Sequence, residues 1–100
     1  MSDRARRAAR SEGVAVELAD LGDWGRARLI AEYDPSGPVI RIDARARAAA
    51  ADPLAHEELA IAHELYHHLE RTGAVPRLGS RREREAAADA YARAFVEGRA

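Results

Sequence analysis

Two histidines and a glutamate near the middle of the chain have the types and the spacing of a metal-dependent hydrolytic site. The sequence there reads His63-Glu64-Leu65-Tyr66-His67, which is the pattern His-Glu-x-x-His. Residues four apart lie on one face of an α-helix, so His63 and His67 can offer imidazole nitrogens to one cation. Glu64 lies about 100° further round the helix, where its carboxylate can take a proton from a metal-bound water. The pattern therefore predicts Zn2+ as cofactor and Glu64 as the general base.

The same pattern has another interpretation, namely an ordinary helix that carries surface histidines. Four His and ten Glu in 100 residues give an expectation of roughly 0.015 chance matches to this pattern. That expectation is low, but it does not exclude the alternative. The residues around the pattern must therefore decide between a metal site and a solvated helix.

The composition restricts the domain organisation and the possible metal ligands. A chain of 100 residues is long enough for one modest core, and we expect residues 1–100 to form a single domain. The chain contains no Cys, which excludes a disulfide framework and a thiolate zinc site. Any metal must therefore be bound by His, Asp and Glu side chains.

Net charge and hydropathy argue against several classes of partner. The formal net charge is −1, although all sixteen basic residues are Arg. The domain as a whole therefore lacks the positive field that is typical of nucleic-acid binding. No apolar run is long enough for a signal peptide or a membrane span. We expect a cytoplasmic location, with no direct nucleic-acid or membrane binding.

The elements that must position the site form an α+β pattern. Alternating apolar and polar residues predict strands at residues 14–18, 26–33 and 39–43. We expect them to form a small three-stranded antiparallel sheet with 39–43 at its exposed edge, packed on the helix that carries the histidines. Capping residues predict helices at residues 2–12, 44–51, 53–72 and 81 to about 97. The large core side chains expected from these elements are Trp24, Tyr33, Leu54, Ile61, Leu65, Leu69, Tyr91, Phe95 and Val96.

The last helix supplies a third ligand if it packs antiparallel to the helix that carries the histidines. His67 lies about five residues before the end of one helix and Glu85 about five residues after the start of the next, and each stretch rises roughly 7.5 Å. We therefore expect Glu85 level with His67, and Asp89, one turn further on, as the acceptor of a ligand histidine's free ring N–H. The alternative is that Glu85 and Asp89 are surface acids that pair with nearby arginines.

Several other side chains near the site have more than one interpretation. His68 is expected to be exposed, although its position also allows it to donate a hydrogen bond during the reaction. Tyr33, Tyr66 and Tyr91 are candidates for a hydroxyl that stabilises an oxyanion, and packing in the core is the alternative. The buried stripe of the last helix is expected to consist of Ala87, Ala90, Tyr91, Ala94 and Phe95.

Residues 62–69 (AHELYHHL) and 85–92 (EAAADAYA) resemble the two motifs of the ImmA/IrrE-type zinc metallopeptidases, members of the gluzincin class. Those motifs read A-H-E-x-G-H and E-x-E-A-N/D-x-F-A. The resemblance implies that His63, His67 and Glu85 bind zinc, that Glu64 is the catalytic base, and that Asp89 orients a ligand. Two residues depart from the pattern. Tyr66 stands where the family usually has Gly, and Ala87 replaces the second Glu of the later motif.

The resemblance predicts the activity and the substrate class. Residues 1–100 are expected to be a minimal zincin-like metalloendopeptidase domain that hydrolyses a peptide bond with metal-activated water. The family commonly acts in the cytoplasm by a limited cut in a regulatory protein, so the expected partner is a protein or peptide substrate such as a transcriptional repressor. The alternative is a non-catalytic interaction or regulatory module that retains the metallopeptidase fold. An intact Glu64 favours the enzyme, because a structural metal site has no use for a base beside its ligands.

Overall fold

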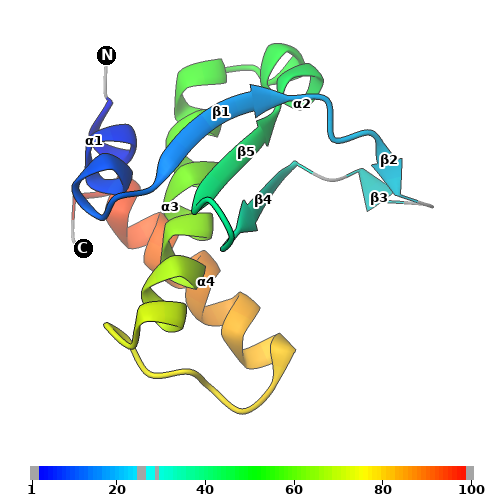
Figure 1. The fold of residues 1–100 in the computed structure, drawn as a ribbon. Coiled ribbons are helices and arrows are strands. Elements are labelled where there is room, and N and C mark those ends of the chain that lie inside the picture. The colour runs from blue at the N-terminus through cyan, green and yellow to red at the C-terminus, as the bar shows by residue number, and fades with distance from the viewer. Residues whose placement is uncertain (1–2, 25–26, 29, 99–100) are drawn as a thin grey trace.

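The structure is a computed structural model that describes residues 3–24, 27–28 and 30–98, and one helix of 20 residues lies at its centre (Figure 1). The elements in chain order are α1 (Arg4–Ser11), β1 (Ala15–Ala19), β2 (Asp23–Trp24), β3 (Ala27–Arg28), β4 (Ala31–Asp34), β5 (Val39–Asp43), α2 (Ala44–Ala49), α3 (Pro53–Thr72) and α4 (Arg81–Val96). The central helix α3 packs against the other three helices and against β4 and β5. The predicted α+β class is therefore confirmed.

The three-stranded sheet is mixed, with strand order β1-β5-β4. Strand β4 is antiparallel to β5, as predicted, with Tyr33 opposite Ile40. Strand β1 is parallel to β5, with Val16 opposite Ile40, so the prediction of an antiparallel sheet is wrong for this pair. Alternation of apolar residues defines the faces of a strand but carries no information about its direction. The residues 20–38 provide the long connection that two parallel strands require.

The second predicted strand and the predicted sheet edge both need correction. The range 26–33 is divided between β3, which pairs with β2 in a separate two-stranded sheet, and β4. Arg26 and Leu29 of that range lie outside the described residues. Strand β5 is the central strand of the larger sheet, so the prediction that residues 39–43 form an exposed edge is wrong. The edge strand that packs against α3 is β4.

The helix boundaries follow from local capping, largely as predicted. The Asp43 carboxylate accepts the Ala46 N–H at 2.9 Å and begins α2. Asp52 caps α3 ahead of Pro53, and Gly73 ends that helix with a φ of +82°, a conformation that disfavours other residues. At the start of α4, the Ser80 hydroxyl accepts the Glu83 N–H at 3.1 Å, which caps the helix, and donates to the Glu83 carboxylate at 3.0 Å. These caps are local in sequence, so they fix the positions of α2, α3 and α4.

Helix α1 is capped from another part of the chain. Asp3 occupies the N-cap position but its side chain accepts no capping hydrogen bond, and Ser2 lies outside the described residues. Instead, the buried Glu58 carboxylate of α3 accepts the Ala5 N–H at 3.0 Å. A negative charge at this end is favourable because the first N–H groups of a helix are unpaired. This contact fixes the start of α1 to the first half of α3.

The core lies between the sheet, α1, α3 and α4, and its members differ in part from the prediction. Ile61, Leu65 and Phe95 are buried as predicted, whereas Val96 is 44% exposed and the Trp24 side chain lies outside the described residues. The buried residues of α4 are Ala88, Ala92 and Phe95, so of the predicted stripe only Phe95 is fully buried, and Ala90 is exposed. Alanines on every side of α4 give little hydrophobic contrast, so the pattern could not fix which face is buried. Tyr33, Leu54, Leu69 and Tyr91 are partly buried.

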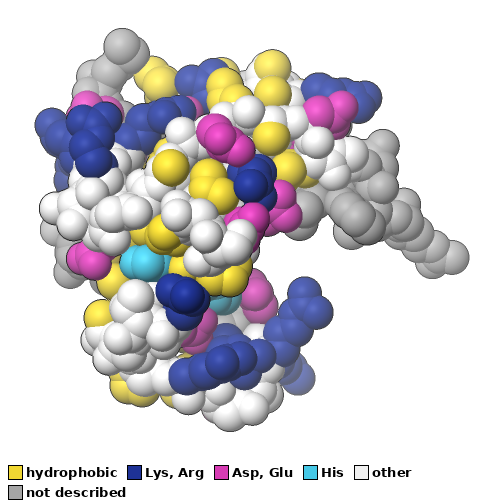
Figure 2. All heavy atoms as spheres, in the orientation of Figure 1, with side chains coloured by type: hydrophobic (Ala, Val, Ile, Leu, Met, Phe, Trp, Pro, Cys, Tyr) yellow, Lys and Arg dark blue, Asp and Glu magenta, His cyan; other side chains and the backbone are white. Residues whose placement is uncertain are grey.

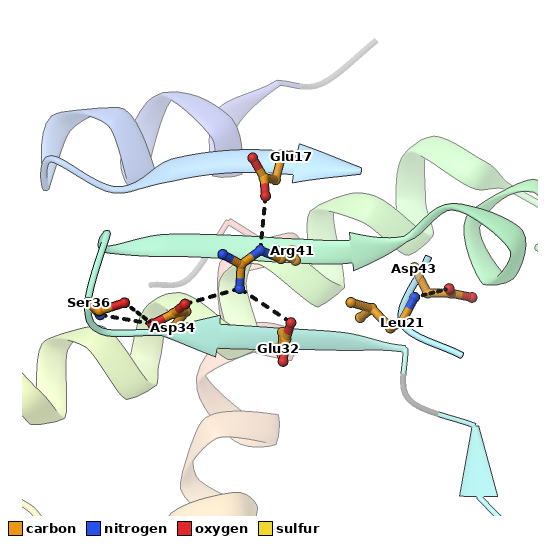
Figure 3. Close-up of polar contacts among 7 residues, drawn as sticks. All are labelled: Glu17, Leu21, Glu32, Asp34, Ser36, Arg41 and Asp43. Atoms are coloured by element: carbon orange, nitrogen blue, oxygen red, sulfur yellow. Dashed lines mark hydrogen bonds and ion pairs between the residues drawn. The ribbon is translucent and has the colours of Figure 1, made fainter. Parts of the chain in front are cut away.

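The face of the sheet that bears Arg41 carries ion pairs between neighbouring strands. Arg41 of β5 donates to Glu17 of β1 at 2.9 Å and to Asp34 of β4 at 3.1 Å, with a longer contact to Glu32 (Figure 3). Alternation along β5 places Ile40 and Ile42 on the opposite, buried face. One guanidinium thus joins the three strands and leaves the apolar face to pack on α3.

Candidate metal site

The structure brings His63, His67 and Glu85 together between α3 and α4. His63 Nε2 lies 3.0 Å from Glu85 Oε2, and His67 Nε2 lies 3.3 Å from Glu85 Oε1. One ligand atom from each residue lies within 4.8 Å of the others, which is close enough for a single ion. The two histidines share a face because they are four apart on α3, and the hairpin of α3 and α4 places Glu85 opposite them. The expected convergence of these three residues is therefore present.

Asp89 occupies the place that the sequence predicted for it. Its Oδ1 atom lies 2.8 Å from His63 Nδ1, one helical turn beyond Glu85 on α4. A ring N–H on Nδ1 can donate to this carboxylate, which leaves the lone pair of Nε2 free for a metal ion. The Asp89 side chain is 61% exposed, so it holds His63 from the solvent side.

Glu70 makes the equivalent contact to the second histidine, and the sequence analysis missed it. Glu70 Oε1 lies 2.8 Å from His67 Nδ1, and its side chain is only 7% exposed. The two residues are three apart on α3, a spacing that brings side chains together on a helix and that could have revealed the pair. Both histidines therefore have Nδ1 against a carboxylate and Nε2 directed at Glu85. This arrangement fits a metal ion, because an oriented imidazole with a basic Nε2 is what metal ligation requires.

Glu64 is nearly buried and has no cation firmly paired with it. Its side chain is 14% exposed, and its Oε2 atom lies 3.9 Å from His63 Nε2. Burial is the main reason why the pKa of the Glu64 carboxyl is raised above its ordinary value, and the nearby Glu85 adds to this effect. The two histidines oppose the shift. The resulting carboxyl is better suited to exchange a proton near neutral pH than an exposed glutamate is.

Tyr66 packs between α3 and α4 beside the cluster formed by His63, His67 and Glu85. Its side chain is buried, and its ring lies 5.6 Å from the Tyr91 ring and 6.3 Å from the His67 ring. The tyrosine therefore fills the contact between α3 and α4 at the position where the resembling family usually has Gly. The hydroxyls of Tyr66 and Tyr91 belong to residues that line neither of the hollows described below.

His68 is buried, so the prediction that it is exposed is wrong. Its Nδ1 atom lies 2.7 Å from the Tyr33 hydroxyl. His68 follows His67 on α3 and turns toward the sheet, where Tyr33 of β4 meets it. Whether a given side of a helix is buried depends on where the neighbouring layer packs, and the sequence did not show that β4 covers this side of α3. The contact ties the edge strand β4 to the helix that carries the cluster.

Two hollows meet at the cluster and share Tyr33, Glu64, His67, Arg81 and Glu85. The first hollow has a volume of about 650 Å³, and its wall includes the apolar side chains Ile30, Leu59, Ala60 and Ala92. The second has a volume of about 610 Å³ and is lined mainly by charged residues. Figure 2 shows histidine and acidic side chains inside the cleft that these hollows form. The cluster is thus reachable from solvent on two sides.

No family model, curated protein or solved structure matches this chain. Within the described part of the chain, no helix combines the length and the apolar character needed to cross a membrane.

Proposed function

We propose that the chain is a zinc-dependent metallopeptidase that hydrolyses a peptide bond with Glu64 as general base. The observation that carries this proposal is the convergence of His63, His67 and Glu85 beside the nearly buried carboxylate of Glu64, whose contact to His63 is as long as 3.9 Å. A site that only stabilised the fold would have no need for such a carboxylate next to three ligands.

The donor set favours zinc among the common metals. Two imidazole nitrogens and one carboxylate form the three-ligand set of catalytic zinc sites, and they leave a coordination position for water. Zinc bound there would supply a Lewis acid and lower the pKa of water to about 7. His63 and His67 would hold the ion through Nε2, while Asp89 and Glu70 keep the two rings oriented.

The remaining residues of the site bind the substrate and move the proton. Glu64 lines both hollows, so its carboxylate can take a proton from water and return it to the leaving amine. Strand β4 borders the first hollow through Ile30, Ala31, Glu32 and Tyr33. Because β4 is an edge strand, an extended peptide can pair with its free side and lie across the cluster. The motif resemblance extends the proposal to a cytoplasmic endopeptidase that cuts a regulatory protein such as a repressor.

The first test is metal content measured by elemental analysis. We expect near one zinc per wild-type chain, sharply less in Glu85→Ala, and an unchanged content in Glu64→Gln. Glu12→Ala, which removes an exposed carboxylate that lines neither hollow, serves as the matched control. Absence of metal in the wild type after zinc is added would favour the non-catalytic interaction module. Loss of metal in Glu64→Gln would show that Glu64 is a ligand and not a base.

A further inference from the structure

The second hollow differs from the first in that four arginines surround it. Arg71 lies in the last turn of α3, Arg77 in the loop that follows, and Arg81 and Arg84 in the first turn of α4. Figure 2 shows dark-blue side chains gathered along the lower lip of the cleft, over this part of the chain. The hollow also includes His67, Glu64 and Glu85, so the arginines lie beside the proposed catalytic cluster.

These four arginines lack carboxylate partners among residues 3–24, 27–28 and 30–98. Arg84 donates to the backbone carbonyl of Leu78 at 3.2 Å. Some arginines elsewhere do pair with acids, since Arg6 and Arg47 share Glu57 and Arg41 contacts three acids. Others in the described part of the chain, such as Arg45 and Arg82, have no carboxylate partner either, so what sets the four apart is that they line one hollow together. Three acids line the hollow, and within the described residues none of them pairs with these arginines. Glu70 contacts His67, Glu85 contacts both histidines, and Glu64 has only a 3.9 Å contact to His63.

Unpaired guanidiniums at a substrate cleft indicate what the cleft binds. A guanidinium presents five N–H donors in a planar fork that matches a carboxylate, and such charge-assisted pairs are stronger than neutral hydrogen bonds. A hollow of about 610 Å³ is about 10 Å across if it is compact, which is about three residues of an extended peptide. A carboxylate within that reach of the scissile bond would meet the arginines.

We infer that the substrate is an acidic peptide, with a carboxylate bound by Arg71, Arg77, Arg81 and Arg84 on one side of the scissile bond. This inference rests on the proposed function. The other side of the bond faces the apolar wall of the first hollow, formed by residues such as Ile30 and Leu59. The substrate is therefore asymmetric, with an acidic flank and an apolar flank. The carboxylate belongs either to an Asp or Glu side chain or to a free C-terminus, since both present the same group.

The test measures peptide binding apart from cleavage. Fluorescent peptide libraries with one fixed residue are titrated into zinc-loaded Glu64→Gln by anisotropy, and the same libraries are given to the wild type to measure kcat/KM. Libraries with Asp or Glu fixed and amidated ends are compared with their Asn and Gln counterparts. Neutral libraries with free or amidated C-termini form the second arm. We expect the preferred carboxylate to improve binding about tenfold or more over its neutral counterpart, with the preference reduced by salt.

The arginines are tested by the double substitution Arg71→Gln/Arg77→Gln, which changes two exposed side chains. We expect it to bring the acidic-to-neutral ratio close to one. The control Arg45→Gln/Arg82→Gln removes the same charge from exposed residues that line neither hollow, and it should keep the ratio. A preference confined to free C-termini would identify the terminal carboxylate as the bound group.

Each contrary result separates the inference from the proposed function. Cleavage without any acidic preference, or a preference that survives the double substitution, would overturn the inference and leave the peptidase intact. Binding of acidic peptides that the wild type never cleaves would overturn the proposed peptidase activity and leave the preference for acidic peptides intact. A single-stranded oligonucleotide that displaces the acidic peptides and binds more tightly than they do would overturn the inference in favour of a nucleic acid.

Discussion

Glu57 and Glu64 lie seven residues apart on the same side of α3, and both side chains are nearly buried, yet their surroundings are opposite. Glu57 is 7% exposed and accepts two hydrogen bonds from Arg6, at 2.8 and 2.7 Å, and one from Arg47 at 3.1 Å. Its pKa is therefore held below the ordinary value, chiefly by the Arg6 hydrogen bonds. Glu64 has no such partner, and burial raises its pKa.

The difference shows that one helix uses a buried carboxylate to join other helices in its first half and directs another at a hollow in its second half. In its first half, α3 uses Glu57 to join Arg6 of α1 and Arg47 of α2, and Glu58 to cap α1. In its second half, Glu64 lines a hollow, and no arginine pairs with its carboxylate within the described residues. A carboxylate that is neutralised by two guanidiniums is a weak base, so the two roles require different neighbours.

The largest expected effect is that of Glu64→Gln on turnover. The substitution keeps the shape of the side chain but removes the base, so cleavage should fall about 10²- to 10⁴-fold. The free energy of unfolding should stay the same or rise slightly, because a neutral amide replaces a carboxyl that burial disfavours in its charged form. Peptide cleavage and urea unfolding measure the two quantities. Turnover of Glu64→Gln within a few-fold of wild type would show that Glu64 is not the general base.

The next effect concerns the two acids that orient the histidines. Glu70→Gln should weaken zinc binding about 10- to 100-fold, because a neutral amide oxygen accepts the His67 ring N–H less strongly than a carboxylate does. Asp89→Asn should have a smaller effect, since its side chain is largely exposed and water can replace it at His63. Competition with a chromogenic chelator gives both affinities, with Glu12→Gln as the control. A larger loss in Asp89→Asn would contradict this order.

The parts of the fold and site that could be predicted depend on short stretches of sequence. Asp52 with Pro53, Gly73, and Ser80 with Glu83 mark the helix ends within a few residues, so the lengths of α3 and α4 followed from them. The lengths of α3 and α4 and the loop between them then determine which residues lie opposite one another when the two helices pack antiparallel. This is why Glu85 could be placed beside His67 before the structure was known.

The parts that could not be predicted depend on distant residues. The direction of β1 and the central position of β5 are set by pairing across the sheet, which alternation does not encode. Glu57 and Arg6 are 51 residues apart, and the sequence around each of them gives no indication that the two side chains pair. The burial of His68 depends in the same way on Tyr33 of β4. Glu70 differs from these residues, because its spacing of three from His67 is present in the sequence and could have predicted their contact.

The third prediction tests the structural end of α3. Glu57→Gln should lower the free energy of unfolding by about 1 to 2 kcal/mol, because Arg6 and Arg47 lose a buried charged acceptor. Metal content and turnover of the folded protein should not change. Glu17→Gln is the matched control, since Glu17 pairs with Arg41 at an exposed position where an ion pair contributes little. A fall in turnover without a fall in stability would mean that the two ends of α3 are not separate.

The smallest expected effect is the pH dependence of the difference in unfolding free energy between the wild type and Glu57→Gln. The pKa of Glu57 is lower in the folded protein than in the unfolded chain, so its contribution to stability is fully present above about pH 5 and is lost as pH falls through the folded-state pKa. The gap in stability between the wild type and Glu57→Gln should therefore narrow from pH 5 to pH 3. Arg6 and Arg47 stay charged over this range, and the titration of the other acids and of the histidines is common to both proteins. Urea unfolding of the metal-free proteins at several pH values measures the gap, and a gap that widens toward acid would assign Glu57 a raised pKa and remove the contrast with Glu64.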